Sequence, residues 1–267
     1  MTAFLSFLFL TASFFSLWIR KDPKIWGSLL GLSLLFGFAS ENILGLGLFF
    51  LMGLAAIWFF YAQKPKAVLF LTLIAITFAF KLHVVPGYQA IDITPRFHIG
   101  LEIAILGLFP LALLVPLSRS LKDWSLVLKG FLAGCAGIGV LAILATATGA
   151  THWAFKMPTF MAIRLWSNLV LTSIPEEGYY RGFLQRELCR YFQNIKGGNL
   201  IALLLTSMIF TAAHIYWSPS LDILGFVFLA SLLYGGVYLY SGKIESAIFC
   251  HFLLNLVHMT FFNYHAM

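Results

Sequence analysis

The sequence predicts an all-α fold, a polytopic transmembrane helical bundle of about 8–10 membrane helices. Of the 267 residues, 61% are hydrophobic and only 10% are charged, whereas a soluble protein would carry about 25% charged residues. Long apolar runs recur along the whole chain, and about 20 such residues cross a hydrocarbon core as a helix. The chain length suits a single bundle without a separate soluble domain.

The apolar runs, bounded by charged residues, Pro or Gly, give the predicted helices in order. We expect them near residues 2–19, 25–40, 43–62, 67–85, 99–117, 126–149, 160–192, 199–217, 221–240 and 244–262. The run 160–192 would be roughly 50 Å long as a helix, which exceeds a hydrocarbon core of about 30 Å. It must therefore tilt, project from the membrane or break, and Pro175 is the expected kink.

Basic residues gather in alternate loops of this map. Most of the 17 Lys and Arg residues follow or flank the first, third, fifth, seventh and ninth predicted helices, and cytoplasmic loops carry such an excess. The pattern supports an integral, multi-pass protein of the plasma (cell inner) membrane, with its N-terminus outside the cytoplasm. The net charge of +7 therefore reflects topology, and we expect the lipid bilayer, with no nucleic acid, as its surroundings.

The arrangement of polar residues changes at about residue 160. Before this point, polar residues within the apolar runs are scattered singly, and after it they come in pairs at helical spacing. We therefore expect one integral membrane unit with two parts. Residues 1–150 form N-terminal transmembrane helices without an assignable motif, and residues 151–267 form the helical core that carries the chemistry.

The first polar motif is E-E-x-x-x-R, formed by Glu176, Glu177 and Arg181. Ionisable residues inside the hydrocarbon are costly and usually mark function. Glu177 and Arg181 are four residues apart with the acid first, the favourable order for an ion pair on a helix. Glu176 points about 100° away around the helix, so its partner must come from elsewhere.

Two further motifs follow on later helices: Phe210-x-x-x-His214 and His251-x-x-x-Asn255. An imidazole and a carboxamide on one helix face can both donate hydrogen bonds into a cavity. Taken singly, His214 fits a buried core histidine, and His251 and Asn255 fit hydrogen bonds between helices. Likewise, the first motif alone fits a structural ion pair. Taken together, an acid, two histidines and an asparagine suit a site that activates water and binds an oxyanion.

Other hydrolytic chemistries lack their required residues. The chain has no H-E-x-x-H motif, and its aspartates fall in predicted loops or at helix ends. Ser207 and His214 would be about 10 Å apart along one helix, which is too far for a dyad. The three cysteines form no C-x-x-C pair.

Three motifs in this order, each on its own predicted helix, resemble the CPBP family of type II CAAX prenyl proteases and bacteriocin-processing or bacteriocin-immunity proteins. The resemblance covers about residues 160–260. It implies an intramembrane endopeptidase, a hydrolase of peptide bonds, that uses glutamate-activated water without a cofactor. The implied substrate is a membrane-associated peptide or protein, either prenylated or carrying a sorting tag.

The resemblance also assigns roles by position. Glu176 would be the general base that activates water, and His214 would hold and polarise that water. His251 and Asn255 would stabilise the oxyanion of the tetrahedral intermediate. The supporting residues would be Glu177, Arg181 and Phe210.

Three alternatives remain at this point. A non-catalytic scaffold or bacteriocin-immunity protein would keep the fold without turnover. A zinc-dependent version of the protease would bind the metal through Glu176, His214 and His251. A proton-coupled transporter could use Glu176 and His214 as a relay, although the sequence has no evident inverted repeat of the kind many transporters contain.

Overall fold

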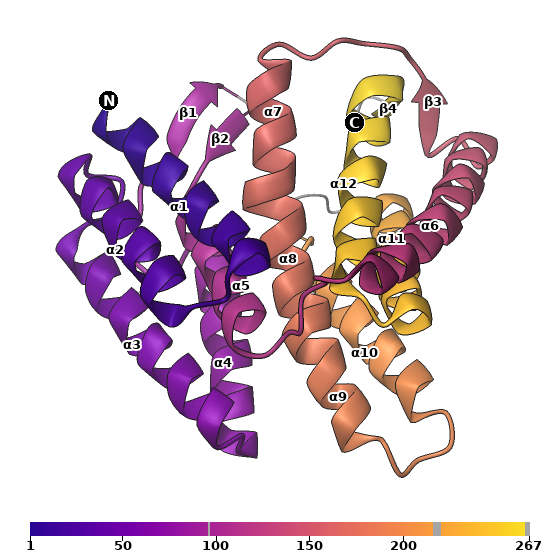
Figure 1. Ribbon diagram of the computed structural model, residues 1–267. Helices are drawn as coiled ribbons and strands as arrows, with labels where there is room; N and C mark the ends of the chain where they lie inside the picture. The colour runs from indigo at the N-terminus through magenta and orange to yellow at the C-terminus, as the bar shows by residue number, and fades with distance from the viewer. Residues whose placement is uncertain (96, 216–219, 265–267) are drawn as a thin grey trace. The chain divides into compact units, whose positions relative to one another are not determined.

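The computed structural model describes residues 1–95, 97–215 and 220–264, and these residues are mainly helical (Figure 1). The helices are α1 (Thr2–Ile19), α2 (Pro23–Ala39), α3 (Gly45–Gln63), α4 (Ala67–Lys81), α5 (Glu102–Leu113), α6 (Leu121–Ala147), α7 (Met161–Ser167), η1 (Asn168–Ser173), α8 (Ile174–Tyr179), η2 (Tyr180–Gln185), α9 (Arg186–Tyr191), α10 (Gly198–Ala212), α11 (Leu221–Ser241) and α12 (Ile244–Phe261). Two short antiparallel, two-stranded sheets complete the fold: β1 (Ile91–Thr94) with β2 (Phe97–Ile99), and β3 (Thr151–Trp153) with β4 (Phe262–Tyr264). Within the described residues, every predicted helical run is present.

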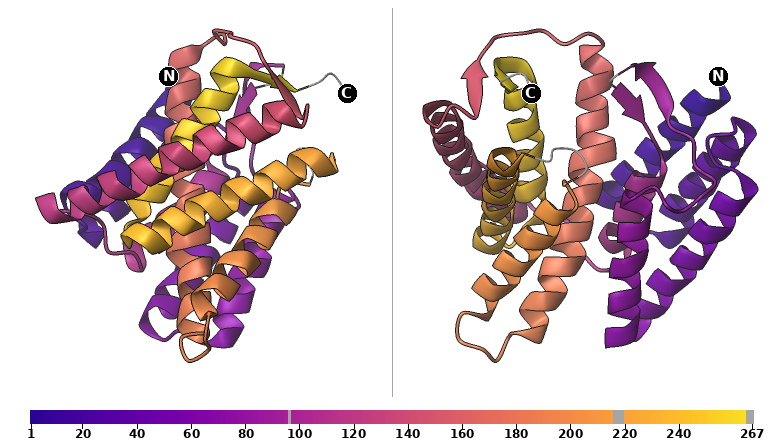
Figure 2. Two further views of the ribbon diagram at one scale, coloured as in Figure 1. Left: turned by 90° about the vertical axis from the view of Figure 1, so that its right-hand side faces the viewer. Right: turned by 180° about the vertical axis from the view of Figure 1, so that it is seen from behind.

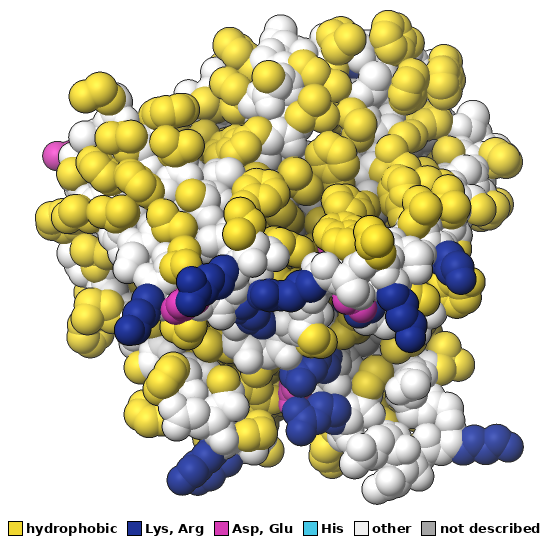
Figure 3. Space-filling model, in the orientation of Figure 1, with side chains coloured by type: hydrophobic (Ala, Val, Ile, Leu, Met, Phe, Trp, Pro, Cys, Tyr) yellow, Lys and Arg dark blue, Asp and Glu magenta, His cyan; other side chains and the backbone are white. Residues whose placement is uncertain are grey.

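Five helices in the described part of the chain are long and apolar enough to cross a membrane: α1, α3, α6, α11 and α12. Four further apolar helices, α2, α4, α5 and α10, are shorter. Hydrophobic side chains cover much of the upper part of the face drawn in Figure 3, as lipid contact requires, and Lys and Arg side chains lie lower on that face. The predicted all-α, polytopic membrane bundle is therefore confirmed, while the count of about 8–10 crossings stays a prediction.

The chain forms two compact units. The first comprises Met1–Pro116 and Val170–Pro175, and the second comprises Leu117–Leu169 and Glu176–Met267. In the first unit, α1 and α2 form a hairpin in which serine hydroxyls donate to backbone carbonyls of the other helix, from Ser6 to Ser33 at 2.7 Å. Small polar residues suit such close helix packing in membranes.

The helix α5 is the buried centre of the first unit, with both of its sides covered by protein. Its Gly107 lies directly against Pro175, and a Cβ atom at this glycine would come within 2.2 Å of the proline backbone. No side chain fits at that distance, so only glycine permits this crossing. The contact lies immediately before the glutamate pair in the sequence.

Several predicted helix ends differ from the structure: α4 ends at Lys81, not at 85, and α5 ends at Leu113, not at 117. At two helix starts the local structure gives the reason. The helix α6 begins at Leu121, not at 126, because Ser120 and Asp123 form a capping box that starts a helix in a charged segment. The helix α5 begins at Glu102, not at 99, because the strand β2 occupies the preceding residues. The helix α10 ends at Ala212, and the end predicted at 217 lies outside the described residues.

The long predicted helix is helical from Met161 to Tyr191, and Figure 1 shows α7, α8 and α9 in one continuous ribbon. The break considered at Pro175 does not occur. Instead, the π-helical segments η1 and η2 flank the short α-helix α8. Proline removes one backbone hydrogen bond and crowds the carbonyl four residues earlier, here at Leu171 within η1. The wider π turn accommodates that crowding, and π segments often occur at functional sites.

In the second unit, α6, α11 and α12 lie side by side (Figure 2). Glycines of α6 allow the close approach: a Cβ at Gly130 would lie 2.6 Å from the Ser246 hydroxyl, and one at Gly134 would lie 2.8 Å from the Cys250 sulfur. Small residues four apart are typical of tightly packed membrane helices. This packing holds α12, which carries two of the predicted site residues.

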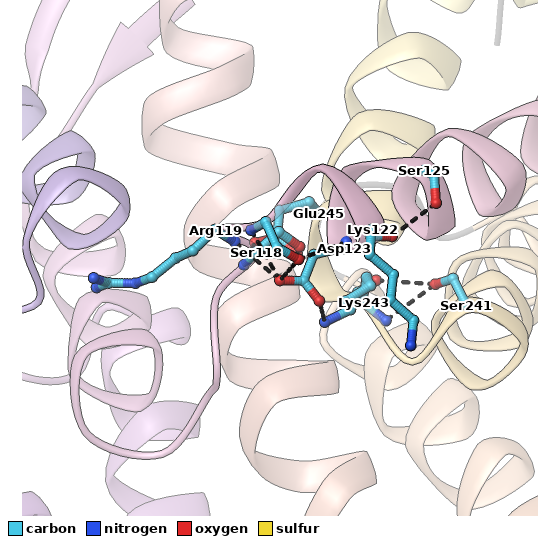
Figure 4. A network of polar contacts seen from close by, with 9 residues as sticks. Ser118, Arg119, Lys122, Asp123, Ser125, Ser241, Lys243 and Glu245 are labelled. Atoms are coloured by element: carbon cyan, nitrogen blue, oxygen red, sulfur yellow. Dashed lines mark hydrogen bonds and ion pairs between the residues drawn. The ribbon is translucent and has the colours of Figure 1, made fainter.

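A polar network joins the start of α12 to the segment that leads into α6 (Figure 4). The Glu245 carboxylate is buried and accepts hydrogen bonds from the backbone N–H and the hydroxyl of Ser118, at 2.6 and 3.0 Å. Beside it, the Lys243 ammonium pairs with Asp123 at 2.5 Å. Both contacts join residues about 120 positions apart, so they fix where α12 begins relative to α6.

Candidate active site

The predicted site residues all belong to the second unit. Glu176 and Glu177 lie in α8, and Arg181 lies in η2. Both carboxylates are buried, with exposed fractions of 9% and 0%. The other predicted residues come from α10 and the turn after it, and from α12, so the three motifs approach one another from three helical segments.

Glu177 is the centre of a buried ion-paired cluster. Its Oε2 lies 3.1 Å from Nε of Arg181, and both side chains are fully buried. The ion pair predicted from the four-residue spacing is therefore present. The other oxygen, Oε1, lies 2.8 Å from Nδ1 of His251. The first and third motifs are thus joined by a direct hydrogen bond between α8 and α12.

Arg181 is held by both acceptors and aromatic rings. Its Nη2 donates to the backbone carbonyl and to the hydroxyl of Ser231 in α11, at 2.7 and 2.8 Å. The guanidinium carbon lies 5.1 Å from the Phe210 ring centre and 5.5 Å from that of Tyr234. Such cation–π contacts strengthen when water is excluded. This explains how a cation can be kept in the interior of an apolar bundle.

The ring of His251 is fixed on two sides. It stacks on Tyr234 with 4.6 Å between ring centres and 12° between planes. Because a carboxylate accepts, Nδ1 of His251 carries the proton that is donated to Glu177, and Nε2 is the ring nitrogen not used in this bond. His251 could donate from Nε2 only if both of its ring nitrogens carried a proton.

His214 lies in the turn just beyond α10, which corrects its predicted position inside the helix. Its Nδ1 lies 2.7 Å from the carbonyl oxygen of Phe210, and the two rings stack at 4.5 Å. A histidine near a helix end often donates to one of the last carbonyls. Here that contact fixes Nδ1 as the protonated nitrogen and leaves Nε2 as the acceptor.

Asn255 is one turn beyond His251 on α12, and it is half-buried. Its Nδ2 donates to Oδ1 of Asn168 at 2.9 Å, and Nδ2 of Asn168 donates to the carbonyl of Phe252 at 3.0 Å. The interhelical hydrogen bonds considered for His251 and Asn255 are therefore both present, at Glu177 and at Asn168. Beyond these bonds, His251 has its second ring nitrogen, Nε2, and Asn255 has the second N–H of Nδ2.

Three residues that build the cluster belong to none of the predicted motifs: Asn168, Ser231 and Tyr234. Asn168 carries a usable signal, since it is an asparagine inside an apolar run, where such residues often hydrogen-bond to another helix. Ser231 and Tyr234 carry no comparable signal. Their contribution depends on which helix packs against Arg181, and the sequence does not specify that contact.

The residues proposed for a zinc site do not fit one. In residues 1–95, 97–215 and 220–264, no three His, Cys, Asp or Glu side chains are placed to hold a metal ion. The Nδ1 donation of both histidines is nevertheless typical of ligating histidines. The described residues therefore offer at most isolated donors to a metal ion.

These observations define a class: a polytopic helical membrane protein with a buried carboxylate–histidine–arginine centre in its C-terminal helices. Residues 158–257 match the model of a protein family described as type II CAAX prenyl endopeptidase Rce1-like. The resemblance inferred from the three motifs is confirmed, and it is a resemblance to membrane peptidases of the CAAX-protease type. No curated protein and no solved structure matches the chain.

Proposed function

We propose that the protein is an intramembrane endopeptidase that hydrolyses a peptide bond of a membrane-associated substrate with glutamate-activated water. One observation carries the proposal: the three motifs meet at one buried cluster within the segment that matches the family. Glu177 contacts His251 at 2.8 Å, and Arg181 lies 5.1 Å from the Phe210 ring that stacks on His214. The activity would belong to residues 151–267 of a plasma-membrane protein.

In this proposal Glu176 is the general base. It removes a proton from a water molecule whose hydrogen bond to Nε2 of His214 holds it in place, and the resulting hydroxide oxygen bonds to the carbonyl carbon. The carbonyl oxygen becomes an oxyanion. When the tetrahedral intermediate collapses, the carbon–nitrogen bond breaks, and Glu176 returns its proton to the leaving amine.

The oxyanion would be stabilised from α12. Asn255 has a second N–H on Nδ2 besides the one given to Asn168, and His251 contributes when its ring is protonated. Such donors are effective because they are already oriented and shielded from water. Glu177 and Arg181 support the site by holding His251, and Phe210 supports it by holding His214.

The substrate class is proposed from the family description, which names prenyl CAAX endopeptidases. A prenylated C-terminal peptide would enter the bilayer by its lipid and present its peptide bond to the helices. The direct test uses the detergent-purified protein and an internally quenched, farnesylated peptide with a CAAX ending. We expect cleavage with a defined new terminus, and faster cleavage than for the same peptide without the prenyl group.

As a control, a cooperative thermal transition of the same sample must show that the purified protein is folded. Equal cleavage of both peptides would support the endopeptidase activity but contradict the proposed preference for prenylated substrates. If the folded protein binds the farnesylated peptide but produces no fragments at any enzyme concentration, the non-catalytic scaffold becomes the better explanation.

We expect the activity to be independent of a metal, because no three ligands are arranged to hold one among the described residues. Prolonged dialysis against EDTA and 1,10-phenanthroline should leave the cleavage rate within about twofold of the untreated protein. A zinc-dependent peptidase treated in the same way serves as the control. A rate that falls with chelation and returns on adding zinc would contradict the metal-free proposal.

A further inference from the structure

We propose that Asn168 is a positioning residue that fixes the orientation of the Asn255 carboxamide. Asn168 belongs to none of the three motifs and lies at the first position of the π-helical segment η1. Its side chain is largely buried, with an exposed fraction of 9%. The inference rests on the proposed function, in which Asn255 donates a hydrogen bond to the oxyanion.

The hydrogen bonds around Asn168 determine which end of each amide points where. A backbone carbonyl can only accept, so the contact of 3.0 Å to the Phe252 oxygen must come from the NH₂ group of Asn168. The oxygen of the Asn168 amide therefore faces Asn255. An oxygen can only accept there, so the contact of 2.9 Å identifies the facing atom of Asn255 as Nδ2.

The donor and acceptor roles along this chain of hydrogen bonds all follow from the Phe252 carbonyl, which can only accept. The fixed carbonyl of Phe252 orients Asn168, and Asn168 orients Asn255. One hydrogen on Nδ2 of Asn255 is used in this bond, and the second remains to donate elsewhere. Phe252 and Asn255 lie three positions apart, within one turn of α12, so the single side chain of Asn168 contacts both.

Without Asn168, the Asn255 amide could rotate by 180° and present its oxygen where the oxyanion forms. An oxygen in that place repels the developing negative charge. Removing an oxyanion donor outright costs about 10²–10³-fold in kcat. Freeing the donor should cost less. We expect about a tenfold loss, which corresponds to an amide that spends roughly nine-tenths of its time in the unproductive orientation.

The test is a double-mutant cycle on the farnesylated CAAX peptide, with the variants Asn168→Leu, Asn255→Ala and the combination. We expect Asn168→Leu to lower kcat about tenfold with KM changed less than twofold, because the donor acts in the transition state. In the Asn255→Ala background the same substitution should change kcat less than twofold. This loss of effect distinguishes action through Asn255 from a general disturbance.

Gln185→Leu is the matched control. Gln185 lies in the same long helix, is fully buried, and its amide donates to the Gly235 carbonyl at 3.1 Å. Its removal should lower the melting temperature while kcat per folded molecule stays within twofold of wild type. If Asn168→Leu does not purify folded, Asn168→Ala removes the same two hydrogen bonds without a larger apolar group.

Two results would overturn the positioning role. One is a wild-type kcat in folded Asn168 variants, and the other is an equal fold-loss with and without Asn255. A wild-type protein that cleaves no peptide is a different failure: it removes the proposed function itself, and the inference falls with it.

Discussion

Glu176→Gln is expected to abolish peptide hydrolysis while the protein still inserts and purifies folded. The amide keeps the shape of the side chain but cannot take a proton from water. A positioned general base contributes about 10²–10⁴-fold to the rate, so the residual rate should be lower by at least that factor. The measurement is kcat for the farnesylated peptide, with KM and the melting temperature determined on the same sample.

The matched control is Glu187→Gln, in α9 of the same long helix. Glu187 pairs with Arg186 at 2.8 Å close to the end of the helix, and neither residue belongs to the three motifs. Its replacement should leave kcat within about twofold. Wild-type turnover by Glu176→Gln would contradict the proposal that Glu176 is the general base.

Arg181→Met is expected to destabilise the fold more than any surface substitution. Its loss leaves the fully buried Glu177 without its compensating charge and removes two hydrogen bonds to Ser231. Removing one partner of a buried ion pair typically costs about 3–5 kcal/mol. The variant should therefore express poorly and show a markedly lower melting temperature in detergent.

A second variant separates charge from packing. In Arg181→Met with Glu177→Gln, no isolated charge remains, so much of the lost stability should return. Arg190→Met, which removes only an exposed partner of Glu187, is the control and should melt like wild type. Normal melting of Arg181→Met together with lost activity would instead indicate that the arginine acts directly in the reaction.

The fold was largely predictable because the burial of apolar side chains in lipid leaves a strong signal in the sequence. Apolar runs identified each helix, and the errors fell at the ends. There, the capping box of Ser120 and Asp123 and the His214 contact to the Phe210 carbonyl decide where a helix starts or stops. Such local hydrogen bonds involve few residues and do not alter the hydrophobic pattern.

The sequence predicted which motif residues lie in the cluster, but it predicted fewer of the hydrogen bonds between them. Spacing along one helix correctly predicted the Glu177–Arg181 pair, because residues four apart share a face. The bond from Glu177 to His251 joins residues 74 positions apart. It depends on how α12 packs, which follows from glycines on α6 and from the Ser118–Glu245 contact rather than from any motif.

The two π-helical segments have a consequence for comparing this chain with its relatives. A π turn is closed by an i→i+5 bond and holds one residue more than an α turn, whereas each extra residue in an α-helix rotates the following side chains by about 100°. The segments η1 and η2 can therefore absorb a difference of one residue in length without rotating α8, which carries the glutamates. In an alignment, a single-residue gap in this helix belongs within residues 168–173 or 180–185, and motif spacings that cross these segments should be allowed to vary by one.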